Sequence, residues 1–205
     1  MSIREEKKQI TKQAIMDAAI TLFSANGFEN TSIEELAKVA GVGKGTVYGY
    51  FQTKKEILHA FCENELDQIY KELVSLANPE APILEQMLTI YMTEFKYVTQ
   101  NKEFGRIFMR QTIFPDENDA KNFLKNEDKY FQLIFPILER AQGRDELRKD
   151  LELLHITGHF YGLYILLMSA WYSGRIPTEE ISTAMELIFR QALEGLQPHS
   201  DSKSK

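Results

Sequence analysis

Cysteine is almost absent from this chain of 205 residues, in which Cys62 is the only one. A lone cysteine excludes an internal disulfide framework and suits a reducing compartment. Long uninterrupted apolar runs are missing too. The most apolar stretch, residues 156–172, contains His159 and two glycines, and a membrane span usually needs about 18 uninterrupted apolar residues. The first eight residues carry charges of both signs, which disfavours a signal peptide. We therefore expect a cytoplasmic protein.

A positive net charge is also lacking, since the chain carries a net charge of −6. This value alone disfavours a nucleic-acid binder, but the charge is unevenly distributed. Residues 1–55 carry eight basic and six acidic residues, a net charge of +2, whereas the remainder carries 16 basic and 24 acidic residues, a net charge of −8. A mildly basic head on an acidic body is typical of a DNA-binding module joined to a domain that avoids DNA.

Helical spacing recurs along the chain, and no segment alternates apolar and polar residues for long enough to predict a sheet. An apolar stripe indicates a first helix: Ile10, Ala14, Ala18 and Leu22. Asn26-Gly27 ends it, because glycine readily adopts positive φ. The capping-box pattern of residues 32–35 starts a second helix. Further helices are expected over 43–50, 54–77, 83–100, 103–113, 118–142, 151–173 and 178–195.

Two of these helices are short, joined by a glycine-containing turn and preceded by an amphipathic helix, which is a helix-turn-helix pattern. Its apolar residues are expected to form a small core: Ile33, Leu36, Ala37, Val42, Val47 and Phe51. The other residues of the second short helix then face outward and suit a DNA surface: Lys44, Gly45, Thr46, Tyr48 and Gly49, with Tyr50 at the helix end.

The chemistry of this surface favours DNA. Lysine neutralises phosphate, hydroxyl groups donate to phosphate oxygens, and a threonine methyl or tyrosine ring can contact a thymine methyl. Thr31 and Ser32 lie at an expected helix N-terminus, where free amides attract phosphate. Glycines at positions 43, 45 and 49 cost helix stability, about 1 kcal/mol each, and permit close approach to a ligand. Lys54 opens the next helix and can contact phosphate by its charge.

The segments that carry this pattern resemble the DNA-binding head of the TetR family of repressors: Thr31-Ser32-Ile33-Glu34-Glu35-Leu36-Ala37, Ala40-Gly41-Val42-Gly43-Lys44-Gly45-Thr46-Val47-Tyr48-Gly49-Tyr50-Phe51 and Lys54-Lys55-Glu56-Ile57-Leu58. The resemblance implies a homodimer whose third helix enters the major groove and whose variable C-terminal domain binds a small inducer. By position it implies DNA contacts at Thr31, Lys44, Thr46, Tyr48, Tyr50 and Lys54. The family often has serine where this chain has Gly43, so a side-chain phosphate contact or helix cap is missing there.

The predicted fold is therefore all-α, with about nine helices. We expect a three-helix helix-turn-helix DNA-binding domain over residues 1–55, a helical ligand-binding and dimerisation domain over 56–197, and a disordered tail over 198–205. The predicted function is that of a ligand-responsive repressor, which binds a palindromic operator as a homodimer and is released by a small, hydrophobic inducer.

Aromatic and methionine residues recur across the helices of the body. Core packing explains most of them, and some line an apolar cavity if the body binds a ligand. The candidates for ligand contact are Phe95, Phe104, Phe108, Phe131, His159, Tyr161, Tyr164 and Met168. Because the body has no concentrated basic cluster, we expect a hydrophobic or aromatic ligand, with acyl-CoA and fatty acids among the candidates, and no cofactor.

The helix over 151–173 is apolar nearly all round, which a small body can bury only if one side meets a partner chain. Together with the helix over 178–195 it is expected to form half of a symmetric four-helix dimer interface. The candidate interface residues are Gly158, Gly162, Ile165, Ser169, Met185, Ile188 and Ala192.

Other functions remain open at this point. His155 and His159 lie four residues apart and suit a metal pair, but a third ligand at helical spacing is lacking apart from Glu152, so a core or pocket role is preferred. Cys62 suits either a redox sensor or a small buried residue. A helical enzyme is not expected, because no nucleophile–base arrangement is readable. A protein-interaction module that has lost DNA binding is the remaining alternative, and Lys44, Thr46, Tyr48 and Lys54 argue against it.

Overall fold

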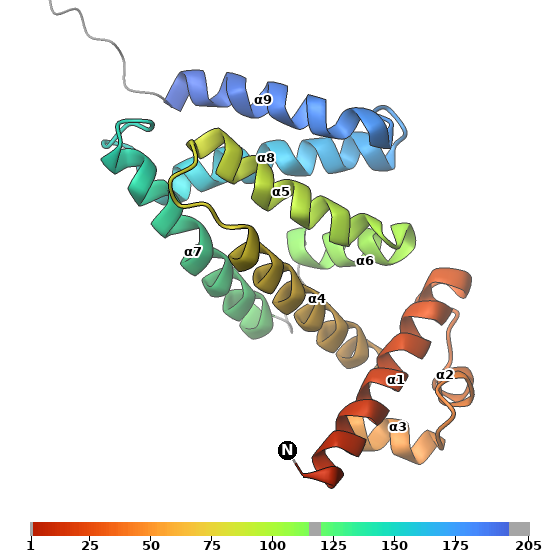
Figure 1. Cartoon of the computed structure of the whole chain (residues 1–205). Helices are drawn as coiled ribbons and strands as arrows, with labels where there is room; N and C mark the ends of the chain where they lie inside the picture. Colours follow the sequence, from red (N-terminus) through yellow and green to blue (C-terminus); the bar gives the residue numbers. More distant parts are fainter. Residues whose placement is uncertain (1, 115–119, 197–205) are drawn as a thin grey trace, which may run out of the picture. The chain divides into compact units, whose positions relative to one another are not determined.

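A computed structural model describes residues 2–114 and 120–196, and over these residues the chain is entirely helical (Figure 1). The described residues form nine α-helices and a 3-10 turn: α1 Ile3–Asn26, α2 Ile33–Val39, α3 Lys44–Tyr50, α4 Lys54–Leu76, α5 Ile83–Thr99, α6 Lys102–Ile113, α7 Ala120–Gly143, α8 Leu153–Tyr172, η2 Thr178–Glu180 and α9 Ile181–Leu196. The all-α prediction is confirmed. The predicted tail over 198–205 lies outside the described residues.

The first helix differs from its predicted apolar stripe. It begins at Ile3, where Ser2 and Glu5 form a capping box, and Ile10 is 63% exposed instead of lying in the core. Its buried face consists of Ile15, Met16, Ala18, Ala19 and Phe23. A spacing of four residues is typical of a helix. Because 3.6 residues complete a turn, however, every fourth residue is rotated a little further around the helix axis. Ile10, at one end of the predicted stripe, therefore no longer points toward the core.

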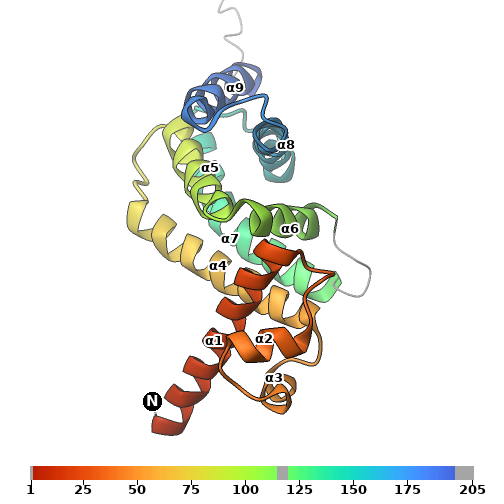
Figure 2. The ribbon, with the colours of Figure 1, turned by 90° about the vertical axis from the view of Figure 1, so that its right-hand side faces the viewer.

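The described chain divides into two compact units, Met1–Tyr70 with Lys96–Asp119, and Lys71–Phe95 with Ala120–Lys205. Helix α6 groups with the N-terminal helices in the first unit, and the domain boundary at residue 55 stays a prediction. In the first unit, α1 contacts α2 and α6, and α2 contacts α3. Figure 2 shows α1, α2 and α3 together. Phe23, Leu36 and Val47 are almost fully buried among them.

The second unit contains α7, α8 and α9 and most of α5. Helices α8 and α9 lie side by side (Figure 1) and contact each other closely. Phe160 of α8 and Phe189 of α9 are both fully buried, with ring centroids 5.1 Å apart. Helix α8 is long and apolar enough to cross a membrane, yet the core helix of a soluble protein passes the same test. Its inner face belongs to the core of this unit.

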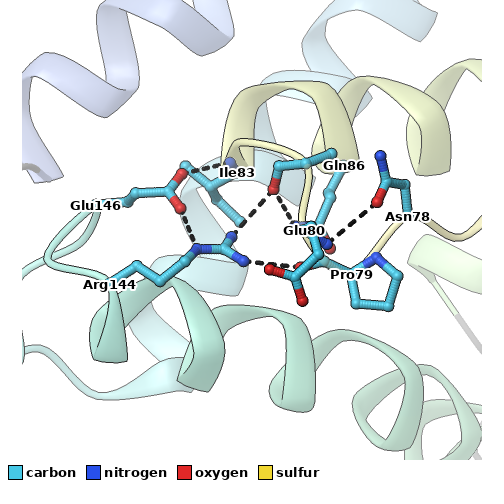
Figure 3. Close-up of polar contacts among 8 residues, drawn as sticks. Asn78, Pro79, Glu80, Ile83, Gln86, Arg144 and Glu146 are labelled. Atoms are coloured by element: carbon cyan, nitrogen blue, oxygen red, sulfur yellow. Dashed lines mark hydrogen bonds and ion pairs between the residues drawn. The ribbon is translucent and has the colours of Figure 1, made fainter.

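The start of α5 is fixed by a polar network that no sequence pattern predicted (Figure 3). The Arg144 guanidinium, just after α7, donates to the Pro79 carbonyl at 2.7 Å and to the Ala81 carbonyl at 3.0 Å. It also pairs with Glu146, and the Glu146 carboxylate accepts the backbone N–H of Ile83 at 2.6 Å. One arginine therefore ties the segment before α5 to the end of α7, and it anchors the helix that carries Tyr91 and Glu94.

Candidate functional site

Helix α2 begins with the predicted capping box. The Ser32 hydroxyl accepts the backbone N–H of Glu35 at 3.2 Å, and the Glu35 carboxylate accepts the backbone N–H of Ser32 at 2.9 Å. These hydrogen bonds lower the pKa of Glu35, so the carboxylate stays ionised at the positive end of the helix dipole. Thr31 is buried, and its hydroxyl donates to the Gly27 carbonyl at 2.9 Å. In this structure Thr31 thus supports the entry into α2.

The turn between α2 and α3 depends on Gly41. Its φ of +68° lies in the left-handed region, which side chains with a Cβ adopt only with strain. The backbone N–H of the next residue, Val42, donates to the Ala37 carbonyl at 3.0 Å, which closes the C-terminus of α2. This tight turn sets the direction of α3 with few residues, as a helix-turn-helix requires.

Helix α3 has one buried side and one open side. Val47 is fully buried and anchors the helix, whereas Tyr48 is 41% exposed. The predicted outward face is confirmed as exposed: Lys44, Gly45, Thr46, Tyr48 and Gly49. Tyr50 at the helix end is half-buried. Gly43 is the N-cap and makes no side-chain capping hydrogen bond, as expected for a glycine at that position.

Two glycines of α3 lie on its open side. A Cβ built on Gly45 or Gly49 would meet no heavy atom of the protein within 4 Å. The interior of the protein therefore does not demand glycine at these positions. Glycine lowers helix stability by about 1 kcal/mol relative to alanine, and no protein atom near either position compensates for this cost.

The cation at the start of α3 is held by an acidic neighbour. Lys44 Nζ lies 2.9 Å from the Glu34 carboxylate of α2, and both side chains are exposed. The hydrogen bond and negative charge of Glu34 raise the pKa of Lys44, so the ammonium stays protonated. An exposed pair of this kind is weak and is easily exchanged. Lys44 is thus oriented on the open surface while remaining available for an anion.

Lys54 lies in a different setting from the phosphate-facing position implied by the resemblance. Its ammonium group donates to the carbonyls of Phe28 at 2.8 Å, Glu29 at 3.1 Å and Thr31 at 2.8 Å, and it lies 4.9 Å from the centre of the Phe28 ring. All three donor positions of the ammonium are used. Lys54 therefore fastens the loop between α1 and α2 to the start of α4.

The body contains a cluster of tyrosines that joins three helices. The hydroxyls of Tyr91 on α5 and Tyr130 on α7 are hydrogen-bonded at 2.5 Å. The ring of Tyr91 lies 5.1 Å from that of Tyr164 on α8, and the ring of Tyr130 lies 6.0 Å from that of Tyr161. Phe131 lies 6.1 Å from Tyr130. The structure thus brings together three of the predicted ligand residues, Tyr161, Tyr164 and Phe131.

The other predicted ligand residues are distributed differently. Phe95 and Met168 are buried in the same unit, and the Phe95 ring packs edge-on against Trp171 at 5.5 Å. Phe108 is buried in the other compact unit, and the side chain of Phe104 lies outside the described part of the structure. His159 is exposed on α8, where its ring nitrogen is 2.9 Å from the His155 carbonyl.

Sequence reasoning missed Glu94, which lies one residue before Phe95 on α5. This half-buried carboxyl is surrounded by protein atoms, and burial raises its pKa from 4.5 to about 7. Burial is the main cause that raises the pKa of Tyr91, Tyr130 and Tyr164, and the negative charge of Glu94 raises all three further. Its position one helical turn after Tyr91 and directly before Phe95, both of them apolar-face residues, is the sequence signal for this group.

The predicted dimer residues fall into two groups. Gly158, Gly162 and Ser169 are exposed on α8, and a Cβ on either glycine would meet open space. Ile165, Ile188 and Ala192 are half-buried. Met185 differs from the prediction, because it is fully buried within the protomer and is therefore not offered to a partner. The large exposed apolar residues of these helices are instead Leu154, Leu166 and Leu187.

Two weaker candidates gain no support. Cys62 is buried, and burial raises the pKa of its thiol, so little thiolate forms at neutral pH. His155 and His159 are both exposed, and His155 lies 3.9 Å from Glu152. Within residues 2–114 and 120–196, no group of three histidine, cysteine or acidic side chains is placed to hold a metal ion.

Comparison with known proteins agrees with the helix-turn-helix geometry. Residues 15–61 match the model of the bacterial regulatory proteins of the tetR family. The chain is 27% identical over 155 residues to the HTH-type transcriptional regulator SrpR of Pseudomonas putida, covering 75% of this chain and 71% of that protein. It is 24% identical over 196 residues to the HTH-type transcriptional repressor NicS of Pseudomonas putida, covering 93% and 88%.

Among solved structures, the fold is similar to that of the transcriptional regulator FadR from Bacillus subtilis in complex with stearoyl-CoA, with a TM-score of 0.77 at 17% identity, covering 90% of this chain and 99% of that chain. An N-terminal helix-turn-helix whose second helix is exposed is the geometry with which DNA-binding transcription regulators enter the major groove. Residues 15–61 are therefore a DNA-binding head of the tetR type, and the relatives that the chain resembles over most of its length are transcription regulators.

Proposed function

We propose that the protein is a cytoplasmic, homodimeric repressor that binds a palindromic operator through α3 and releases it when a small apolar ligand binds the body. The observation that carries this proposal is the open face of α3. Lys44, Thr46 and Tyr48 project from a helix whose other side is fixed by buried Val47. A cation, a hydroxyl and an aromatic ring on one rigid surface suit phosphates and base edges in a major groove.

We divide the predicted DNA contacts into side chains that can still reach DNA and side chains that already hydrogen-bond the backbone of the protein. Lys44 would exchange Glu34 for a phosphate, because an exposed ion pair is worth little in water. Tyr48 and Thr46 would reach bases or sugar-phosphate, while Gly43 and Gly45 leave room for the DNA backbone. Ser32 and Tyr50 flank this face. Thr31 and Lys54 would act differently, since both already hydrogen-bond carbonyls of the α1–α2 loop. We assign them the role of positioning the head.

Dimerisation is proposed through the open sides of α8 and α9. Leu166 is 61% and Leu187 is 56% exposed, and Gly158 and Gly162 face open space in the protomer. Small residues beside exposed leucines allow two helices to approach closely and bury apolar surface. Two reading helices would then lie in successive major grooves, about 34–36 Å apart.

Ligand control is supported by the apolar body and by the similar FadR structure, which contains stearoyl-CoA. Repression is supported by the similarity to NicS, which is named as a repressor. In this chain α4 contributes residues to both compact units, so a change at its C-terminal end can bias its N-terminal end. The proposed dimer can hold its two DNA-binding heads at a separation that fits the operator or at one that does not. A ligand would release DNA if it bound the second form more tightly than the first, and linkage requires nothing more than this difference in affinity.

The experiment that tests the DNA surface is the salt dependence of operator binding. The protein would be mixed with its own upstream DNA, and the affinity measured by fluorescence anisotropy across a salt series. Lys44→Ala is expected to weaken binding and to reduce the slope of log K against log salt by about 1, because one phosphate contact is lost.

Lys54→Met is the matched control, since it also removes one lysine from the head. It is expected to weaken binding with the slope unchanged, because its ammonium holds carbonyls instead of phosphate. An unchanged slope for Lys44→Ala would contradict the assignment of Lys44. A reduced slope for Lys54→Met would return Lys54 to the phosphate contacts.

A further inference from the structure

Helix α5 brings an ionisable group into the apolar body. Glu94 is half-buried, and among the described residues its carboxyl forms no ion pair or hydrogen bond. Burial is the cause that raises its pKa to about 7. A carboxylate removed from water without a cation beside it is costly. Glu94 is such a group, and its neighbours on α5, Phe95 and Tyr91, are both buried.

A second polar group of the same unit also lacks a partner among the described residues. The hydroxyl of Tyr164 on α8 is fully buried and forms no hydrogen bond within residues 2–114 and 120–196. Most buried polar groups are hydrogen-bonded, so one that is not calls for an explanation. Glu94 lies one helical turn after Tyr91 on α5, and the Tyr91 ring lies 5.1 Å from the Tyr164 ring. Burial is the main cause that raises the pKa of the Tyr164 hydroxyl, and the negative charge of Glu94 raises it further.

Aromatic rings surround these two groups. Tyr91 and Tyr164 lie 5.1 Å apart, and Tyr130 and Tyr161 lie 6.0 Å apart, measured between ring centroids. Tyr91 and Tyr130 satisfy each other through their hydroxyls, so a ligand that enters between these helices meets their rings and not their hydroxyls. Tyrosine faces attract cations, and the attraction grows when water is excluded. A carboxylate, a free hydroxyl acceptor and several ring faces are together complementary to an ammonium group.

We propose that Glu94, the hydroxyl of Tyr164 and the rings of Tyr91, Tyr130 and Tyr161 bind the ammonium group of an amine ligand whose remainder is apolar. The ligand supplies the positive charge that Glu94 lacks and, when it carries N–H groups, a donor for the Tyr164 hydroxyl. Buried Phe95 and Met168 of the same unit suit its apolar part. The inference rests on the proposed ligand-responsive function and names the class of ligand.

Anionic ligands fit this site less well. The phosphates of an acyl-CoA or the carboxylate of a fatty acid would meet the negative charge of Glu94, which costs binding free energy in a low-dielectric site. The similarity to the structure that contains stearoyl-CoA, at 17% identity, is a similarity of fold and does not transfer the ligand. The polar groups of this chain favour the opposite charge.

The test uses the full-length protein and three synthetic probes in isothermal titration calorimetry: 4-phenylbutyltrimethylammonium, its neutral isostere with a tert-butyl group in place of the trimethylammonium, and 4-phenylbutylamine. At pH 8 the wild type is expected to bind the quaternary cation at least about tenfold more tightly than the neutral isostere. Glu94→Gln is expected to abolish this preference. Glu85→Gln, an exposed carboxyl on the same helix, is the matched control and is expected to retain it.

Tyr164→Phe removes the Tyr164 hydroxyl and keeps the ring, so it measures what the hydroxyl contributes to binding. It is expected to weaken the primary amine several-fold and to leave the quaternary cation unchanged, because only the amine donates a hydrogen bond to that hydroxyl. Circular dichroism of each variant establishes that the helices are retained. Equal binding of the cation and its neutral isostere, or a cation preference that survives Glu94→Gln, overturns the proposal.

Stearoyl-CoA and stearate complete the experiment, with operator release measured in parallel. Release of DNA by stearoyl-CoA, with no binding of the cations, refutes the amine site and leaves the proposed repressor function standing. Cation binding that depends on Glu94 but leaves DNA bound supports the site and contradicts ligand control through it. The two failures are therefore distinguishable.

Discussion

The Glu94 carboxyl predicts an unusual dependence of stability on pH. Its pKa is about 7 in the folded protein against an ordinary value of 4.5, so between these values the folded state binds more protons than the unfolded state. Stability contributed by this group therefore falls as the pH rises from about 4.5 to about 7. Each pKa unit corresponds to about 1.4 kcal/mol, so the raised pKa of Glu94 lowers the stability of the folded state by about 3 kcal/mol at pH 8 and about 1 kcal/mol at pH 5.

Glu94→Gln removes the charge while keeping the size of the side chain. The variant is expected to be more stable than the wild type by about 3 kcal/mol at pH 8 and by about 1 kcal/mol at pH 5. Urea unfolding followed by circular dichroism at both pH values measures the difference. Glu85→Gln, exposed on the same helix, is expected to change stability by less than about 0.5 kcal/mol at either pH. A Glu94→Gln variant that is destabilised equally at both pH values would refute the reasoning.

Four further predictions follow from named contacts. Binding of a quaternary ammonium probe should tighten about tenfold from pH 6 to pH 8 as Glu94 ionises; calorimetry showing no pH dependence would contradict this. Gly45→Ala should stabilise the protein by about 1 kcal/mol but weaken operator binding, because its new methyl occupies open space on the DNA side; unchanged affinity would show that DNA does not approach there. Lys54→Met should destabilise the protein by about 2 kcal/mol, since three carbonyls lose a charged donor; unfolding at the wild-type urea concentration would argue against its positioning role. Leu166→Glu, at a 61% exposed position on α8, should shift the chain toward monomer in sedimentation velocity; an intact dimer would exclude this face.

Local patterns were enough to predict most of the helices and the face of α3. The capping box of Ser32 and Glu35 depends on residues three apart, and the exposure of Tyr48 beside buried Val47 follows from helical periodicity. Both features depend on residues a few positions apart, so a short stretch of sequence is enough to predict them. The prediction erred for Ile10, where the spacing was right but the buried face was not.

Features that depend on distant residues were not predictable in this way. Lys54 hydrogen-bonds carbonyls 23 to 26 residues away, and a lysine at a helix start looks the same in sequence whether it binds phosphate or backbone. Arg144 fixes a segment more than 60 residues distant. Met185 and Leu187 are two residues apart on α9, yet one is fully buried and the other is 56% exposed. Only the packing of α8 against α9 decides which of them lies inside.

The central claim is that the open face of α3 reads DNA. Its most direct test is a footprint of the protein on its own upstream region, with affinity measured for wild type and Tyr48→Ala at fixed low salt. Because Tyr48 is 41% exposed on the open side of α3, the variant should keep a melting temperature close to that of the wild type. We expect it to lose at least about tenfold in affinity, the loss expected for one base contact. A folded Tyr48→Ala variant with the wild-type footprint and affinity would contradict the claim.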